Sequence, residues 1–158
     1  MEKSKALARA AALCSRSEQC EADVHTKLSR WLDDPDAIHD IITRLKEEGF
    51  IDDLRYARAY VHDKFLYNGW GRIKLRAMLR AKGIDSEAID NALIQIDDNE
   101  YAQMLHRLLT NKLNSIKHAD ARHTRAALLR FAASRGFESG MCYSITNSII
   151  GNHEGDDY

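Results

Sequence analysis

Residues 49–91, GFIDDLRYARAYVHDKFLYNGWGRIKLRAMLRAKGIDSEAIDN, contain the signals that decide the fold. An acidic helix start at Asp52 follows the first glycine, and an aromatic-rich segment runs on to a Gly-Trp-Gly break at 69–71. A basic segment then continues to Gly83. A glycine just past a helix adopts the left-handed conformation at little cost, so these glycines predict helix stops. The stretch is therefore predicted to form a compact module of three helices.

The pattern of this module recurs along the chain. Apolar residues at helical spacing return after 51 positions, and more faintly after a further 53. The glycine stop also returns, because Gly136 with Phe137 repeats the pair Gly83 and Ile84. In the three copies the recurring apolar positions are Ile38, Ile41, Ile42 and Leu45; Ile89, Ala92, Leu93 and Ile96; and Met141, Cys142, Ile145 and Ile149. These shifts predict three internal repeats.

The expected fold class is all-α, with three tandem three-helix repeats forming an elongated, curved body. Repeats of about 50 residues are near the lower limit for independent stability, so neighbouring repeats are expected to stack. Asp52, Asp85 and Asp120 are predicted N-caps. The expected helices lie near 4–15, 18–32, 36–48, 52–67, 71–82, 86–96, 98–114, 120–135 and 139–150. The expected boundaries are 1–49, 50–97 and 98–151 for the repeats, and 152–158 for a flexible acidic tail.

The composition is that of a globular protein. Apolar residues make up 44% of the 158 residues and charged residues 30%, which excludes a disordered chain. The start of the sequence lacks an uninterrupted apolar segment of signal-peptide length, and no run reaches the roughly 20 apolar residues of a membrane span. We therefore expect a cytoplasmic protein with no membrane partner. The formal net charge of −1 argues against a protein that coats nucleic acid by charge alone.

The sequence contains no motif typical of an enzyme: no Walker loop, GxSxG, HExxH or GxGxxG. The adjacent pair Asp52 and Asp53 is better explained by helix capping than by a metal or acid pair. Cys14, Cys20 and Cys142 do not have the spacing of a zinc set, and free buried thiols are expected. We predict no catalytic residues, no metal and no cofactor.

The basic segment that follows Gly71 gives the sharpest functional prediction. Arg72, Arg76 and Arg80 recur every four residues and would form one ridge of guanidinium groups, suited to phosphates or carboxylates. Lys74 and Lys82 add to its positive charge. The alternative is a solvated face of a surface helix. The segment from Lys64 to Gly83 contains no acid, which favours binding.

A second basic stretch and two aromatic residues complete the candidate site. Arg122, Arg125 and Arg130 lie in a segment of the third repeat where basic residues greatly outnumber acids. Tyr67 and Trp70 stand at the bend before the basic segment, where they would either anchor a partner or staple two helices together. The expected partner-binding residues are Arg72, Lys74, Arg76, Arg80, Lys82, Arg122, Arg125 and Arg130, with Tyr67 and Trp70 as aromatic anchors.

These residues resemble the RecX family of bacterial regulators of the RecA recombinase. The resemblance rests on GFIDDLRYARAYV at 49–61, on GRIK at 71–74 with Leu79 downstream, and on KGI at 82–84. The turn at 16–18, followed by a helix with Lys27 and Leu28, is similar to the first repeat of the family. Specific similarity covers roughly residues 8–96, and the last third agrees mainly in its helical pattern.

The resemblance implies a monomeric regulator without catalysis, built from three tandem three-helix repeats. Members of the family bind RecA and the filament that RecA forms on single-stranded DNA. They block filament extension or promote disassembly, which lowers recombinase, ATPase and coprotease activity in DNA repair and the SOS response. The basic faces of the second and third repeats would then be turned towards the filament. Two alternatives stay open: a helical module that binds DNA directly, with weak affinity expected here, and a helical adaptor with no nucleic-acid role.

Overall fold

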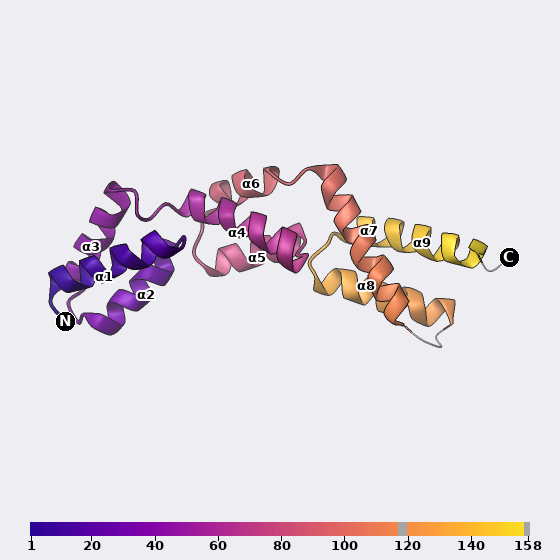
Figure 1. The fold of residues 1–158 in the computed structure, drawn as a ribbon, viewed down its shortest axis with the longest axis horizontal. Coiled ribbons are helices and arrows are strands. Elements are labelled where there is room, and N and C mark those ends of the chain that lie inside the picture. The colour runs from indigo at the N-terminus through magenta and orange to yellow at the C-terminus, as the bar shows by residue number, and fades with distance from the viewer. Residues whose placement is uncertain (117–119, 157–158) are drawn as a thin grey trace. The chain divides into compact units, whose positions relative to one another are not determined.

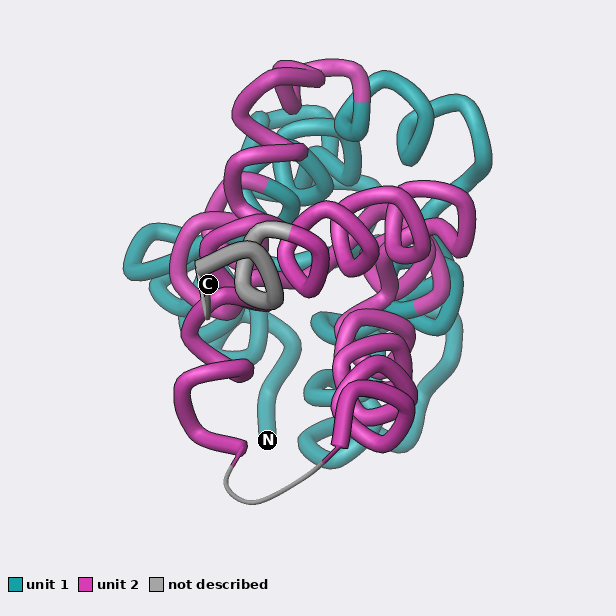
Figure 2. Tube along the Cα trace, turned by 90° about the vertical axis from the view of Figure 1, so that its right-hand side faces the viewer, with its two compact units in different colours: residues 1–61, 78–93 teal, residues 62–77, 94–158 magenta. Residues whose placement is uncertain are grey.

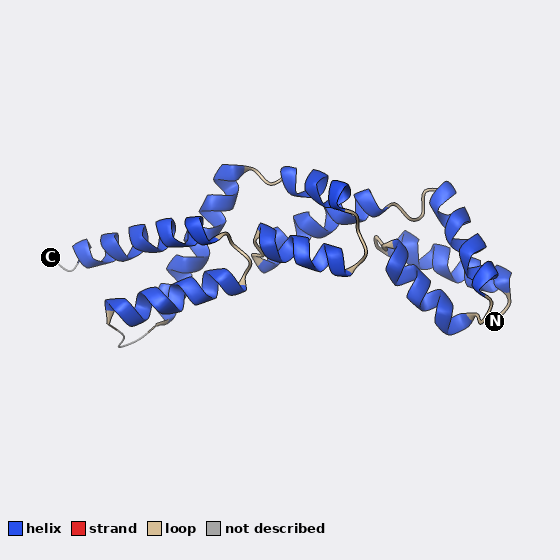
Figure 3. Ribbon diagram, turned by 180° about the vertical axis from the view of Figure 1, so that it is seen from behind, coloured by secondary structure: helices blue, strands red, loops and turns tan. Residues whose placement is uncertain are grey.

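The computed structural model describes residues 1–116 and 120–156, with side chains described as far as residue 151. Nine helices and no strand are found in these ranges (Figures 1 and 3), as the apolar spacing predicts. The helices are α1 Lys3–Arg16, α2 Glu21–Trp31, α3 Pro35–Glu47, α4 Asp53–Asn68, α5 Arg72–Ala81, α6 Ser86–Ile94, α7 Asp98–Ser115, α8 Ala121–Ser134 and α9 Ser139–Asp156. The predicted all-α class is confirmed.

Three aspartates cap helices where the sequence predicts them. The carboxylate of Asp52 accepts a hydrogen bond from the backbone N–H of Arg55. In the same way, Asp85 accepts from the N–H of Ala88 and Asp120 from the N–H of His123. These bonds satisfy amides of the first turn, which have no partner inside the helix. Asp34 and Asp97 cap α3 and α7 in the same way and were not predicted.

The predicted glycine stops share one hydrogen-bond pattern. Gly49, Gly83 and Gly136 have φ of 79°, 78° and 90°. Each residue after the glycine donates its N–H back to the carbonyl five positions earlier in the chain, as Phe50 does to Leu45 at 2.8 Å. This is the Schellman arrangement, which satisfies carbonyls of the last helical turn. The local signal and the observed geometry agree at all three positions.

The chain divides into two compact units (Figure 2). Unit 1 contains residues 1–61 and 78–93, and unit 2 contains residues 62–77 and 94–158. Helices α1, α2 and α3 pack pairwise within unit 1, and α7, α8 and α9 pack pairwise within unit 2. The expected middle repeat at 50–97 contributes to both units. The three repeat boundaries stay a prediction.

Most of the predicted apolar stripes form the core. All eight stripe residues of the first two copies are buried, and Leu28 and Leu79 are fully enclosed. In the third copy the outcome is different, because Met141 and Ile145 are only half-buried while Thr146 is fully enclosed. The hydroxyl oxygen of Thr146 has no hydrogen-bond partner among the described residues. The apolar pattern alone does not predict a buried threonine at this position.

The helical backbone of α9 extends beyond the predicted helix. Residues 152–156 belong to α9, although the sequence analysis places them in the tail. Residues 157–158 of the expected tail lie outside the described residues.

Candidate functional site

The basic helix α5 begins without a side-chain cap of its own. In its first turn the N–H of Gly71 donates to the carbonyl of Arg135 at 2.7 Å, and that of Ile73 donates to the carbonyl of Gly136 at 3.0 Å. The N–H of Arg72 donates to the hydroxyl of Tyr101 at 3.0 Å. These three amides would otherwise lack partners, because the first turn of a helix has no preceding carbonyls. The turn between α8 and α9, together with α7, therefore caps α5 within unit 2.

This junction depends on two glycines in direct backbone contact. A Cβ added at Gly71 would lie 2.6 Å from the backbone nitrogen of Phe137 and closer still to the Gly136 carbonyl. A Cβ added at Gly136 would lie 2.9 Å from the Cα of Lys74. No side chain fits at such distances. Sequence analysis identifies both glycines as local breaks, and the structure shows that each also makes room for the other.

Arg72 takes part in an internal network at this junction. Its guanidinium lies 3.9 Å from the ring centroid of Tyr101, is 2.8 Å from Asp98 and is 3.5 Å from Glu138. The hydroxyl of Tyr101, which is fully enclosed, donates to a carboxylate oxygen of Glu138. Burial of Tyr101 and its hydrogen bond to Glu138 raise the pKa of the phenol, so the hydroxyl keeps its proton and acts as a donor.

The three arginines of the predicted α5 ridge therefore differ in their environment. The side chain of Arg72 is 26% exposed and holds two carboxylates, whereas Arg80 is exposed near the end of the helix. Arg76 lies half-buried between them along the helix. The local four-residue spacing was correct, but the carboxylates that pair with Arg72 come from α7 and the start of α9. Whether these arginines bind a partner stays a prediction.

Lys82 also forms an ion pair within unit 1. Its ammonium group contacts both carboxylate oxygens of Asp23, at 3.0 and 3.1 Å, and so joins the turn after α5 to α2. The hydrogen bond to Asp23 raises the pKa of Lys82, which favours the charged form. The partner lies 59 positions away in the chain, so the sequence pattern could not identify it.

The three predicted arginines of α8 are exposed. Arg125 donates to the side-chain oxygen of Asn147 on α9 at 3.0 Å. The guanidinium groups of Arg122 and Arg130 make no ion pair or hydrogen bond among the described residues. Their guanidinium groups are therefore accessible to a partner with negative charge.

The two predicted aromatic anchors differ in their environment. Tyr67, near the end of α4, is 81% exposed. Trp70 is half-buried, and its ring lies 4.4 Å from the ammonium of Lys74 and 5.1 Å from that of Lys64. Of the two, only Tyr67 has the exposure of a side chain ready to meet a partner.

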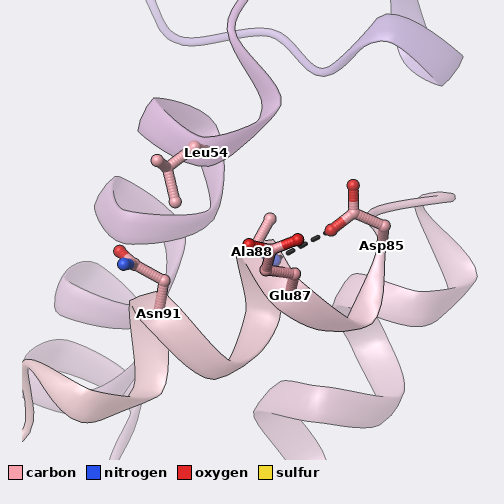
Figure 4. A pocket seen from close by; sticks show the side chains of 5 residues that line it. All are labelled: Leu54, Asp85, Glu87, Ala88 and Asn91. Atoms are coloured by element: carbon pink, nitrogen blue, oxygen red, sulfur yellow. Dashed lines mark hydrogen bonds between the residues drawn. The ribbon is translucent and has the colours of Figure 1, made fainter.

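A small surface pocket lies in unit 1, between α4 and α6 (Figure 4). It has a volume of about 200 Å³ and is lined by Leu54, Asp85, Glu87, Ala88 and Asn91. The guanidinium of Arg58 donates twice to the side-chain oxygen of Asn91, at 2.9 and 2.6 Å. Since a cation already binds one of the polar lining groups, we assign no ligand to this pocket.

The described residues contain neither a metal-binding cluster nor a membrane-spanning helix. No group of three or more His, Cys, Asp or Glu side chains is arranged to hold a metal ion in residues 1–116 and 120–151. Among the described helices, none combines the length and the apolar character needed to cross a membrane.

Burial raises the pKa of all three cysteine thiols, which keeps them protonated.

Comparison with known proteins identifies relatives of this chain. Residues 52–93 match the model for the second three-helix domain of RecX. The chain is 30% identical to the regulatory protein RecX of Mycobacterium sp. over 156 residues, which cover 92% of this chain and 85% of that one. It is 28% identical to the regulatory protein RecX of Amycolatopsis mediterranei over 71% of this chain, and it spans 64% of that relative's length.

A solved structure has the same fold. The crystal structure of a regulatory protein RecX superposes with a TM-score of 0.84 at 25% identity, covering 92% of this chain and 71% of that one. The sequence relatives, the match to the middle helices and the shared fold agree with one another. This chain therefore belongs to the RecX family.

Proposed function

We propose that this protein is a non-catalytic regulator that binds the RecA recombinase and the filament that RecA forms on single-stranded DNA. It acts in the cytoplasm as a monomer, and it blocks filament extension or promotes disassembly. RecA-dependent recombination, ATP hydrolysis and coprotease activity fall as a result. The observation that carries the proposal is the 30% identity to a regulatory protein RecX across most of both chains.

The exposed cations of the protein support a binding role. Arg122 and Arg130 on α8 are exposed and have no partner among the described residues, and Arg80 is exposed near the end of α5. Arginine is enriched in protein interfaces because its planar guanidinium forms paired hydrogen bonds with carboxylates. Several weak contacts of this kind with successive subunits of a filament add through effective concentration.

Direct binding to bare DNA through α5 is less well supported. Arg72 and Lys82, at the two ends of the basic segment, already pair with carboxylates of the protein. The amides of the first turn of α5 also have protein partners. Fewer cations are then left for phosphates, and a few phosphate contacts give weak, salt-sensitive binding at physiological salt.

The test is a titration of RecA ATPase on single-stranded DNA with substoichiometric amounts of this protein. RecA from the same organism is used, with a gel shift on bare DNA as control. We expect ATPase activity to fall at ratios well below one protein per RecA. No effect at equimolar protein would refute the proposal, and tight binding to the bare DNA in that case would establish a direct DNA-binding function.

Charge-reversal variants locate the contact surface. Arg122→Glu with Arg130→Glu is expected to raise the concentration needed for half inhibition by roughly tenfold, because exposed attractive pairs become repulsive ones. Arg16→Glu with Arg30→Glu reverses two exposed arginines at the ends of α1 and α2 and is the matched control, expected to change little. Equal inhibition by both variants would place the contact elsewhere.

A further inference from the structure

Two aromatic rings of unit 2 each hold two cations. The ring of Trp70 lies 4.4 Å from the ammonium of Lys74 and 5.1 Å from that of Lys64. The ring of Phe131, on α8, lies 5.1 Å from the guanidinium carbon of Arg135 and 5.4 Å from the ammonium of Lys112. We call this set the cation–aromatic band; its members are Lys64, Trp70, Lys74, Lys112, Phe131 and Arg135.

Two hydrogen bonds join the two halves of the band. The guanidinium of Arg135 donates a hydrogen bond to the backbone carbonyl of Asn68 at 2.9 Å, which joins the end of α8 to the end of α4. The carbonyl of Arg135 also accepts a hydrogen bond from the N–H of Gly71. Arg135 therefore bonds to the chain both before and after Trp70. Every member of the band is half-buried, which leaves the long cationic side chains packed along the surface with limited freedom.

Three cations of the band are not neutralised by a carboxylate. Lys74, Lys112 and Arg135 form no ion pair among the described residues. Their environment differs from that of Arg72, which pairs with both Asp98 and Glu138. An aromatic ring attracts a cation through its quadrupole without cancelling its charge. The band therefore keeps its positive potential in a prearranged form, so little side-chain entropy is lost when an anion binds.

Exposed apolar side chains lie next to these cations in the chain. Tyr67 is 81% exposed and lies one helical turn after Lys64 on α4. Ile73 is 54% exposed and immediately precedes Lys74 on α5. Large apolar side chains exposed beside polar groups are typical of protein interfaces. A partner that covers this surface must offer both carboxylates and apolar side chains.

We propose that the cation–aromatic band binds an acidic segment of a partner protein, in which carboxylates alternate with apolar side chains. The carboxylates pair with Lys74, Lys112 and Arg135, and the apolar side chains cover Tyr67 and Ile73. The inference rests on the proposed function in one respect, namely that the protein acts by binding another protein. It adds the chemistry of the partner segment that unit 2 would bind.

A nucleic-acid strand fits the same surface less well. Single-stranded binding sites stack bases on open aromatic rings, but the rings of Trp70 and Phe131 are already engaged by cations. A sugar–phosphate backbone has no apolar groups that match Ile73. With three or four phosphate contacts, affinity would also fall steeply with salt.

The experiment measures fluorescence anisotropy of a labelled peptide with the repeating sequence Glu-Asp-Leu, added to the full-length protein. Two competitors are compared at the same charge concentration: poly-glutamate and oligo-dT. We expect the labelled peptide to be displaced best by its own unlabelled form, less by poly-glutamate, and least by oligo-dT. Displacement by oligo-dT at lower concentration than by the unlabelled peptide would overturn the inference in favour of nucleic acid.

A triple variant tests the residues. Lys74→Gln, Lys112→Gln and Arg135→Gln together are expected to weaken peptide binding roughly tenfold, as the sum of a few exposed charge pairs. The matched control removes three positive charges from unit 1 through Lys5→Gln, Lys27→Gln and Arg30→Gln. Equal binding by the two triple variants would overturn the inference, provided that circular dichroism shows both to be folded. Tyr67→Ala keeps every charge and removes an exposed side chain, so the bond between Arg135 and Asn68 is left in place. It is expected to weaken binding several-fold, and unchanged binding would contradict the apolar part of the inference.

The same variants separate this inference from the proposed function. If wild-type protein inhibits RecA ATPase and the band variant inhibits equally well, the band inference fails while the proposed function stands. If wild-type protein has no effect on RecA but binds the acidic peptide through the band, the proposed function fails while the chemistry of the band is supported.

Discussion

Replacement of Gly136 by alanine should destabilise the protein far more than the same change at another glycine stop. Gly136 has φ of 90°, which costs an L-residue about 1–2 kcal/mol. Its new Cβ would also meet the backbone of Lys74 at under 3.0 Å, so the first turn of α5 must move. That movement breaks the bonds from Gly71 to Arg135 and from Ile73 to Gly136. Each lost bond costs about 0.5–1.5 kcal/mol, so strain and lost bonds together give a total of about 2–5 kcal/mol.

Two further glycines separate the contributions to this effect. Gly49 has φ of 79° but nothing within 4 Å of an added Cβ, so Gly49→Ala carries the conformational strain alone, about 1–2 kcal/mol. Gly71 has no positive φ, and Gly71→Ala carries the clash alone. We expect the destabilisation to decrease in the order Gly136→Ala, Gly71→Ala, Gly49→Ala.

Urea unfolding followed by circular dichroism measures the three free energies through shifts of the midpoint at constant slope. If the two compact units unfold in separate transitions, the fluorescence of Trp70 in a Trp31→Phe background reports unit 2. A loss for Gly136→Ala no larger than that for Gly49→Ala, or an unchanged stability for Gly71→Ala, would refute the close backbone contact on which the estimate rests.

Three other substitutions test buried and half-buried polar groups. Tyr101→Phe removes a buried hydroxyl that bonds to two groups, and we expect a loss of about 1–3 kcal/mol in urea unfolding, whereas no loss would contradict the network. Thr146→Val replaces an enclosed hydroxyl without a partner, so thermal unfolding should show a gain of about 1 kcal/mol; a loss would show that the hydroxyl is bonded in solution. The pKa of Lys82 is raised above 10.5 by Asp23, so its contribution to stability is complete below that pH and is lost as pH rises through the folded-state pKa. Asp23→Asn should therefore flatten the fall in melting temperature above pH 10.5, and an unchanged fall would contradict the pair.

The elements of the fold that depend on local signals could be predicted from the sequence. A helix start needs only a short carboxylate before the first turn, and Asp52, Asp85 and Asp120 cap as expected. A glycine stop is equally local, and the apolar stripes of the first two copies are buried at every position. Thr146 is the exception, since a polar residue at a core position gives no signal in an apolar pattern.

The candidate site was harder to predict because its contacts join distant parts of the chain. The four-residue spacing and the absence of acids within the segment predicted a ridge of arginines suited to binding, but Arg72 pairs with Asp98 and Glu138 from distant parts of the chain. The role of Tyr101 was missed, because a tyrosine within a predicted helix is equally compatible with the core and with the surface. The positions of Lys112 and Arg135 beside the ring of Phe131 depend on tertiary packing, so residue spacing gives no signal for them. Residue types indicate which chemistry is available, and only the packing shows which groups are already paired.

The tertiary capping of α5 has a consequence for synthesis on the ribosome. The partners of its first turn lie far downstream, and the bond between Arg135 and Asn68 spans 67 positions. At roughly 5–20 residues per second, the ribosome needs about 3–13 seconds to add that length of chain. During this interval the N–H groups of Gly71 and Ile73 have only water as a partner, and the basic segment emerges ahead of the residues that will hold it. The nascent chain therefore passes through a stage in which the start of this basic helix has no tertiary cap, and completion of the Gly136 turn ends that stage.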